Sequence, residues 1–217
     1  MKRAAATALI VAAVALAALH AGADAAGELS GTVSLGLSGV PLAAVAPIVV
    51  YLEPLAGGDA GTVRSRGVPK MRQRDARFSP SFLVMAAGQS LEMVNDDAIY
   101  HNVFSYSKPN DFDLGLYPAG ETRKLPLRHP GVVKLYCSIH ESMNATILVT
   151  PSRWFAIAST SGRYVLTGIP AGRYRAVAWA ERLPATEREI ELGAGEIRSL
   201  DWEIGAPGQA PPSAVAR

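Results

Sequence analysis

The chain has 217 residues, of which 18% are charged, and its formal net charge is +2. Because positive and negative side chains are interspersed, the sequence lacks the electrostatic footprint of a nucleic-acid-binding protein. It contains a single cysteine, Cys137, which excludes an internal disulfide as a source of stability.

The N-terminus has the features of a cleavable secretory signal peptide. Lys2 and Arg3 precede an apolar run over residues 4–19, and the segment 23–25 (ADA) fits a small-x-small cleavage site. We therefore expect residues 1–25 to be removed and the mature chain to lie in the periplasm, with no stable membrane insertion. A retained membrane anchor is the alternative, because the run approaches the lower length limit for a span; its alanine-rich composition favours cleavage.

The remaining sequence predicts an all-β protein. It is dense in Val, Ile, Tyr and Thr, and Gly and Pro recur at short intervals, a pattern typical of a sandwich or barrel. Strands are expected near residues 29–35, 47–55, 77–85, 90–95, 101–105, 122–127, 132–137, 145–150, 153–158, 163–166, 174–180, 187–192 and 197–204.

Three segments between or after these strands predict other structure. Residues 41–46, or a turn near Asp111, are candidates for a short helical turn. Residues 64–77 carry six Lys or Arg against one Asp, and we interpret them as an exposed loop rather than a docking patch. The tail, residues 205–217, is rich in Gly, Pro, Ala and Ser and is expected to be disordered.

The strand that ends in the cysteine has a readable polarity. In GVVKLYC, Val133, Leu135 and Cys137 alternate with Lys134 and Tyr136. Because successive side chains of a strand point to opposite faces, and lysine marks the solvent face, Cys137 is predicted to point into the core.

Soft and borderline metal ligands gather around this cysteine. The set comprises two imidazoles, one thiol and one thioether: His101, Cys137, His140 and Met143. A trigonal His2Cys plane with a weak axial Met is the arrangement of blue-copper centres. Zinc favours a carboxylate or a further Cys or His over a thioether, and haem attachment requires a Cys-x-x-Cys-His motif that is absent.

Taken one at a time, these residues have ordinary structural explanations. A lone cysteine is usually a small buried hydrophobe, and a lone methionine usually fills core space. The distant His101, export and the lack of a second cysteine together favour copper over coincidence. The remaining mature histidine, His129, lies in a Pro-Gly turn and is interpreted as a surface residue.

The motifs around these residues resemble the plastocyanin and amicyanin family of cupredoxins. The matching segments are HNV at 101–103, PGVV at 130–133 and YCSIHESM at 136–143, and the short loop is more similar to that of amicyanin. The resemblance covers residues 78–150. The segment 104–126 also resembles exported bacterial proteins labelled as methylamine-utilisation proteins.

This resemblance implies a Greek-key β-sandwich that carries one type 1 copper ion. It makes His101, Cys137 and His140 the equatorial ligands and Met143 the axial ligand. The backbone amide of Asn102 would bond the thiolate, and the exposed edge of His140 would be the electron port. Glu141 stands where relatives commonly carry Pro.

The flanking regions suggest a second small β-sandwich. SGRYVLTGIPAGRYRAVAWAE, at 161–181, resembles carboxypeptidase regulatory-like or transthyretin-like modules, as do the N-terminal strands. Residues 27–66 and 151–204 would form this module, with a cupredoxin domain over 68–150 inserted between its halves. Alternatively, the N-terminal strands join the cupredoxin sheet. Core packing is favoured over a carbohydrate platform for the aromatic residues Trp154, Tyr174, Trp179 and Trp202.

The sequence therefore predicts a soluble periplasmic one-electron carrier that serves an unidentified redox partner protein. It is not expected to be an enzyme, because one type 1 site lacks the additional coppers that reduce oxygen. Asp96 and Asp97 are interpreted as turn residues rather than acid–base catalysts. The alternatives are a protein for copper storage, delivery or sensing, and an adhesion or glycan-binding module built on the same fold.

Overall fold

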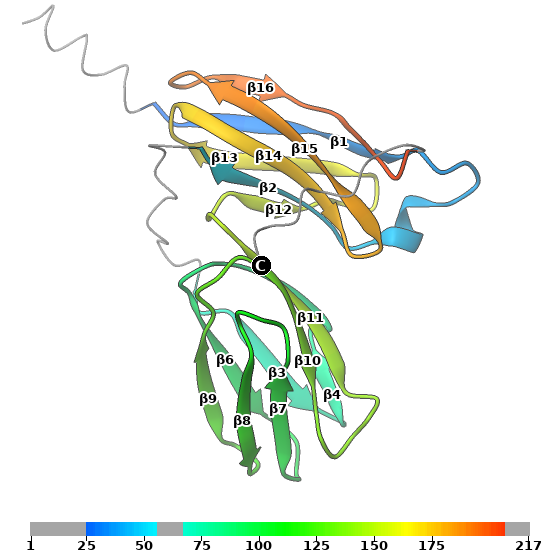
Figure 1. The fold of residues 1–217 in the computed structure, drawn as a ribbon, viewed down its shortest axis with the longest axis vertical. Helices are drawn as coiled ribbons and strands as arrows, with labels where there is room; N and C mark the ends of the chain where they lie inside the picture. The colour runs from blue at the N-terminus through cyan, green and yellow to red at the C-terminus, as the bar shows by residue number, and fades with distance from the viewer. Residues whose placement is uncertain (1–24, 56–66, 207–217) are drawn as a thin grey trace, which may run out of the picture. The chain divides into compact units, whose positions relative to one another are not determined.

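The structure is a computed structural model that describes residues 25–55 and 67–206. Within these ranges the chain forms seventeen β-strands and one short 3-10 helix, so the all-β prediction is confirmed (Figure 1). None of the helices in these ranges has the length and hydropathy needed to cross a membrane. The predicted signal peptide, and all of the predicted tail beyond residue 206, lie outside the described residues.

The described chain divides into two compact units. Residues 25–55 and 154–206 form one, which we call the flanking unit, and residues 67–153 form the other, which we call the inserted unit. Each unit has a hydrophobic core cluster of its own. The inserted unit interrupts the flanking unit in sequence.

The flanking unit consists of two sheets. One has the order β13-β1-β16, with β17 also paired to β1, and the other has the order β12-β2-β14-β15 (Figure 1). The elements are β1 (Gly27–Leu35), η1 (Leu42–Val45), β2 (Ile48–Pro54), β12 (Phe155–Ile157), β13 (Arg163–Ile169), β14 (Gly172–Ala180), β15 (Leu183–Leu192), β16 (Ile197–Ser199) and β17 (Trp202–Ile204).

In both sheets of the flanking unit, strands that precede the inserted unit pair with strands that follow it. β1 pairs antiparallel with β13, and β2 lies between β12 and β14. Phe155 is opposite Tyr51, and the Leu52 amide donates to the Trp154 carbonyl at 2.9 Å. The N-terminal strands therefore belong to the flanking unit, and the alternative that they extend the sheets of the inserted unit does not hold.

Three of the four aromatic residues considered for a carbohydrate platform are buried in the flanking unit. Trp154, Tyr174 and Trp202 expose at most 2% of their surface, and Trp179 is half-buried. The rings of Trp154 and Tyr174 meet edge to face, with centroids 5.8 Å apart. Core packing is thus confirmed for these three rings, and the platform interpretation is wrong for them because a sugar cannot stack on a buried face.

Tyr164, in β13, is hydrogen-bonded to β17 and to the segment before it. Its hydroxyl donates to the Leu200 carbonyl at 2.6 Å and accepts from the Trp202 indole N–H at 3.1 Å. Burial raises the pKa of Tyr164 to about 12, so the hydroxyl stays protonated at neutral pH.

We expect Tyr164→Phe to lower the free energy of unfolding by about 1–3 kcal/mol, since it leaves the buried Trp202 N–H and the partly buried Leu200 carbonyl without this partner. Urea titration of the wild type and the variant, followed through the unfolding transitions of both units, would measure the effect. Tyr106→Phe is the control, because Tyr106 is 80% exposed and should change stability by less than about 0.5 kcal/mol. Equal stability of the two variants would contradict the expected role of Tyr164.

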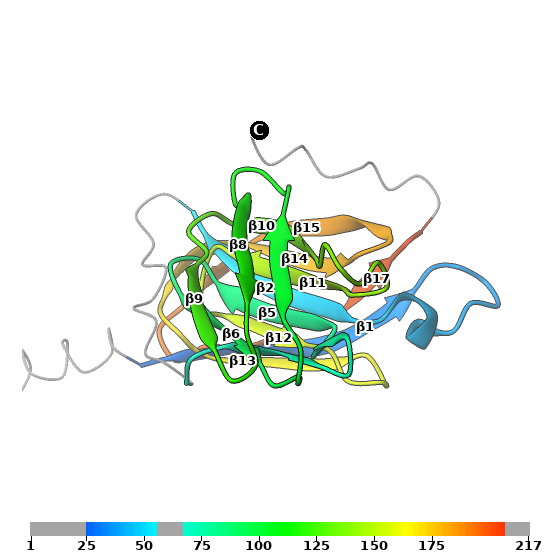
Figure 2. The same ribbon diagram turned by 90° about the horizontal axis from the view of Figure 1, so that it is seen from below.

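The inserted unit is a sandwich of two mixed sheets. Their orders are β5-β11-β10-β7-β8 and β4-β3-β6-β9, and both contain one parallel pair. β7 and β8 lie side by side in Figure 1, and Figure 2 shows the same strands from below, with β8 labelled. The elements are β3 (Lys70–Arg74), β4 (Arg77–Ser79), β5 (Phe82–Ala86), β6 (Ser90–Asn95), β7 (His101–Ser105), β8 (Phe112–Tyr117), β9 (Thr122–Pro126), β10 (Gly131–Tyr136) and β11 (Asn144–Thr150).

The helical prediction over residues 41–46 is confirmed, because residues 42–45 form the 3-10 helix η1. Just before Asp111, the Asn110 amide donates to the Ser107 carbonyl and closes a turn, and β8 follows. The predicted strand over 77–85 is divided into β4 and β5. Within the described part of the basic run, residues 70–74 form β3 rather than a loop.

β3 was missed because its outward side chains are long cations. Met71 and Gln73 are fully buried, while Lys70, Arg72 and Arg74 are exposed. Lys70 pairs with Glu92 on β6 at 3.0 Å, so the charged face is neutralised locally by its neighbour. Alternation of inward and outward side chains is a signal of a strand, but in this segment only Met71 and Gln73 mark the inward face.

Candidate metal centre

Strand β10 directs Cys137 into the core of the inserted unit. Val133 and Leu135 are fully buried, Cys137 is 6% exposed, and Tyr136 is 40% exposed. The predicted inward orientation of the thiol is therefore confirmed. β10 ends at Tyr136, and β11 begins at Asn144. These two residues are paired between the strands, so the ends of the intervening loop 137–143 are held together.

His101 reaches the thiol from the start of β7. β7 is hydrogen-bonded to β10, and the His101 side chain is fully buried. Its Nδ1 lies 3.8 Å from the Cys137 sulfur. Residues that are 36 positions apart are thus brought into contact by pairing of their strands.

His140 completes a three-residue cluster. Its ring centroid is 5.0 Å from that of His101, with the planes inclined by 50°. The donor atoms of His101, Cys137 and His140 all lie within 4.8 Å of one another. Among residues 25–55 and 67–206, this is the cluster of His, Cys, Asp or Glu side chains with the spacing to hold a metal ion.

Met143 lies in the same core. The Met143 amide donates to the His140 carbonyl at 2.9 Å, which forms a turn in the loop. The Met143 side chain is 1% exposed and belongs to the same hydrophobic cluster as Cys137. The four residues singled out in the sequence therefore lie at the end of β10, in the loop after it and at the start of β7.

The donor set fits copper. The His140 Nδ1 is buried and has no hydrogen-bond partner in the part of the chain that the structure describes. Leaving a buried polar atom unpartnered costs free energy, and a metal ion at the cluster would satisfy it. Thiolate and thioether suit Cu(I), while imidazole also suits Cu(II), and no carboxylate belongs to the cluster.

Asp97 contacts the outer nitrogen of His101. Its Oδ2 lies 3.0 Å from the His101 Nε2 and accepts from the Ala76 amide at 2.9 Å. Its Oδ1 accepts from the Ala98 amide at 3.0 Å. The Ala76 hydrogen bond, followed by that of His101, lowers the pKa of Asp97 to about 2, so the carboxylate is ionised at neutral pH.

The sequence interpretation of Asp97 was incomplete. It is a turn residue, as predicted, but its carboxylate also contacts a candidate metal ligand. The spacing of four residues between Asp97 and His101 was the available signal. Nothing in that spacing shows that the side chain of Asp97 turns back toward the ring, because the segment 96–100 has no regular periodicity.

Asn102 links two neighbouring strands. Its side-chain amide nitrogen donates to Asp113 Oδ1 at 2.7 Å, which joins β7 to β8. The residue is 5% exposed. The expected hydrogen bond from its backbone amide to the thiolate stays a prediction.

His129 and Glu141 both lie at the surface. The His129 backbone exchanges hydrogen bonds with the buried Asn110, which accounts for the turn there. The interpretation of His129 as a surface turn residue is confirmed. Next to Glu141, His140 is partly exposed and Ile139 is 51% exposed, so one edge of the cluster reaches solvent.

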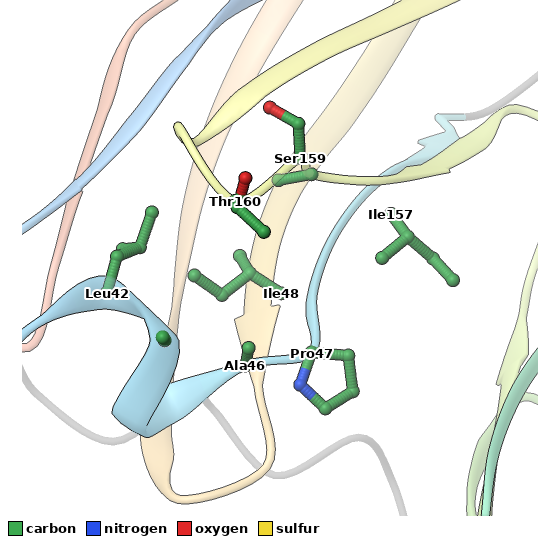
Figure 3. A pocket seen from close by; sticks show the side chains of 9 residues that line it. Leu42, Ala46, Pro47, Ile48, Ile157, Ser159 and Thr160 are labelled. Atoms are coloured by element: carbon green, nitrogen blue, oxygen red, sulfur yellow. The ribbon is translucent and has the colours of Figure 1, made fainter.

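A separate hollow of about 320 Å³ lies in the flanking unit (Figure 3). It is lined by η1, the start of β2 and the segment after β12, with Leu42, Ile48 and Ile157 prominent. Its polar groups come from Ser159 and Thr160, and none of its lining side chains titrates near neutral pH. The hollow therefore offers neither metal ligands nor acid–base chemistry.

Comparison with known proteins gives a likeness of fold only. No protein-family model matches the chain, and no curated protein matches it. Solved structures of cupredoxins do match part of it. A purple cupredoxin from Nitrosopumilus maritimus is 21% identical over 38% of this chain and 99% of its own, with a TM-score of 0.35.

Two further solved structures are similar to the same limited extent. Amicyanin from Paracoccus versutus is 15% identical over 39% of this chain and 83% of its own, with a TM-score of 0.35. A copper-containing nitrite reductase from Thermus scotoductus is 18% identical, with a TM-score of 0.37. That match covers 55% of this chain and 28% of the reductase.

Proposed function

We propose that the inserted unit holds one type 1 copper ion and that the protein is a one-electron carrier. The observation that carries this proposal is the cluster of His101, Cys137 and His140, whose donor atoms lie within 4.8 Å of one another. The buried and unpartnered Nδ1 of His140 adds to it. Bound copper would supply the Cu(I)/Cu(II) couple.

The chain's own residues would fix the ligand geometry before the metal arrives. His101 is anchored in β7, and Cys137 follows β10 directly. Ligands on rigid strands limit rearrangement when the charge of the centre changes. His140, the partly exposed ligand, would provide the edge through which a redox partner protein exchanges electrons.

We also propose that the mature protein acts in the periplasm. The support is the signal-like N-terminus, with Lys2 and Arg3 before the apolar run 4–19 and the ADA segment at 23–25. N-terminal sequencing of the protein released from the periplasm tests this, with a start near Ala26 expected. An intact N-terminus recovered in the membrane fraction would overturn it.

A role in copper storage or delivery would use the same ligands but would require ready metal exchange. The burial of His101, Cys137 and Met143 favours a metal that is held rather than passed on. Timed removal of copper by a chelator separates the two functions. Loss over hours supports the carrier, and loss within seconds supports delivery.

The first test is an absorption spectrum of the purified chain after addition of one equivalent of Cu(II). We expect an intense visible band from charge transfer between the thiolate and copper, together with reversible bleaching by a mild reductant. The same titration with Zn(II) is the colourless control. A colourless copper complex, or no copper uptake, would contradict the proposed function.

A further inference from the structure

The carboxylate of Asp97 joins the β3–β4 turn, 21 residues earlier in the chain, to the start of β7. It receives the Ala76 amide from the β3–β4 turn at 2.9 Å and the Ala98 amide from its own loop at 3.0 Å. The third contact is with the Nε2 of His101 at 3.0 Å. Three donors thus converge on the two carboxylate oxygens, and one of them is a histidine of the candidate metal centre.

The β3–β4 turn has a costly backbone conformation. Asp75 and Ala76 have φ angles of +52° and +51°, and they connect the paired residues Arg74 and Arg77. Positive φ at both central residues is the requirement of a two-residue type I′ hairpin, in which glycine, asparagine and aspartate are usually found. Asp75 fits this preference and Ala76 does not, so the turn carries strain at Ala76 that other contacts must offset.

Ala76 makes two contacts that can offset this strain. Its amide donates to Asp97, and its methyl group packs against the hydrophobic cluster that contains Cys137 and Met143. Glycine would preserve the hydrogen bond and lose the packing. The turn is therefore fixed against the same core that surrounds the candidate ligands.

We propose that the β3–β4 turn positions a metal ligand through Asp97. The turn holds the carboxylate through the Ala76 amide, and the carboxylate holds the Nε2 proton of His101. Neutral imidazole carries its proton on one nitrogen only, so the Nδ1 that faces Cys137 keeps its lone pair for a metal. The identity of that metal as copper rests on the proposed function.

Removal of the charge of Asp97 should weaken metal binding. Asparagine offers one acceptor oxygen where three donors converge, so it cannot satisfy Ala76, Ala98 and His101 together. Carboxylates that orient ligating histidines raise ligand basicity, and their loss typically lowers metal affinity about 10- to 100-fold. A less basic imidazole also disfavours Cu(II), so the reduction potential should rise.

The experiment compares Asp97→Asn with Asp96→Asn in the full chain. Asp96 is the matched control, because it lies one residue away and pairs with Arg72 instead of a histidine. Competition with a chelator gives Cu(II) affinity, and voltammetry gives the potential. We expect a 10- to 100-fold loss of affinity and a higher potential for Asp97→Asn, with little change for Asp96→Asn. Equal effects in both variants would overturn the proposal.

NMR of the metal-free protein supplies a readout that does not depend on copper. In the wild type we expect His101 in the Nε2–H form, with its ring proton and the Ala76 amide both protected from exchange. At least one of these protections should be lost in Asp97→Asn, because asparagine offers a single acceptor oxygen. An Nδ1–H form in the wild type would overturn the positioning role even if copper binds, whereas absence of copper binding with the expected tautomer would overturn only the proposed function.

Discussion

Cys137→Ser should abolish the visible absorption band of the copper-loaded chain. Cys137 is the only cysteine in the sequence, so no other residue can supply the thiolate from which the charge transfer originates. Serine replaces a soft sulfur donor with a hard hydroxyl that stays protonated, and Cu(I) binding suffers most because it depends on soft donors. We expect complete loss of the band and a preference for Cu(II) over Cu(I).

The fold itself should tolerate this change, which makes the result interpretable. Serine is close to cysteine in size, and Cys137 is already at the edge of the core, where it is 6% exposed. Ser138→Ala, at an exposed neighbouring position, is the matched control and should retain full colour. Retention of the band in Cys137→Ser, with unchanged circular dichroism, would exclude Cys137 as the copper ligand.

Copper loading should stabilise the inserted unit strongly and leave the flanking unit unchanged. A ligand that binds only the folded state stabilises it by about 4 kcal/mol when its free concentration is about a thousand times its dissociation constant. For a unit of this size, 1 kcal/mol raises Tm by roughly 4–8 °C, so we expect an increase on the order of 15 °C or more. The flanking unit has a separate core that contains none of the candidate ligands.

Scanning calorimetry of the metal-free and copper-loaded chain would measure this difference. The two cores predict two transitions, of which only one should move. His101→Ala should remove the copper-dependent shift, because it deletes a fully buried ligand. An equal shift of both transitions, or a shift that persists in His101→Ala, would show that copper acts elsewhere on the chain.

Local patterns allowed much of the candidate site to be predicted. The alternation of Val133, Leu135 and Cys137 fixed the direction of the thiol, and the spacing of Cys137, His140 and Met143 placed them on one loop. The pairing of β7 with β10 was not visible in either segment alone. His101 was included because its chemistry matched the other ligands, and the structure brings its Nδ1 to 3.8 Å from the sulfur.

The parts that could not be predicted depend on long-range contacts. β3 escaped notice because Lys70, Arg72 and Arg74 obscure its alternation, although its inward Gln73 donates to the Tyr117 hydroxyl across the sandwich. The role of Asp97 depends on the Ala76 amide, 21 residues earlier. Local sequence patterns contain no information on which distant residue Gln73 or Asp97 will contact.

The pairing of β2 with β12 explains how one chain can hold two independent units. The chain leaves the flanking unit after β2 and returns at β12, and those strands are already neighbours, with Tyr51 opposite Phe155. For the flanking unit, the inserted unit is thus equivalent to the tip of a hairpin. Because the entropy of closing a loop grows only slowly with its length, by about 0.6 kcal/mol per doubling, a whole folded unit can occupy that tip at little cost to its host.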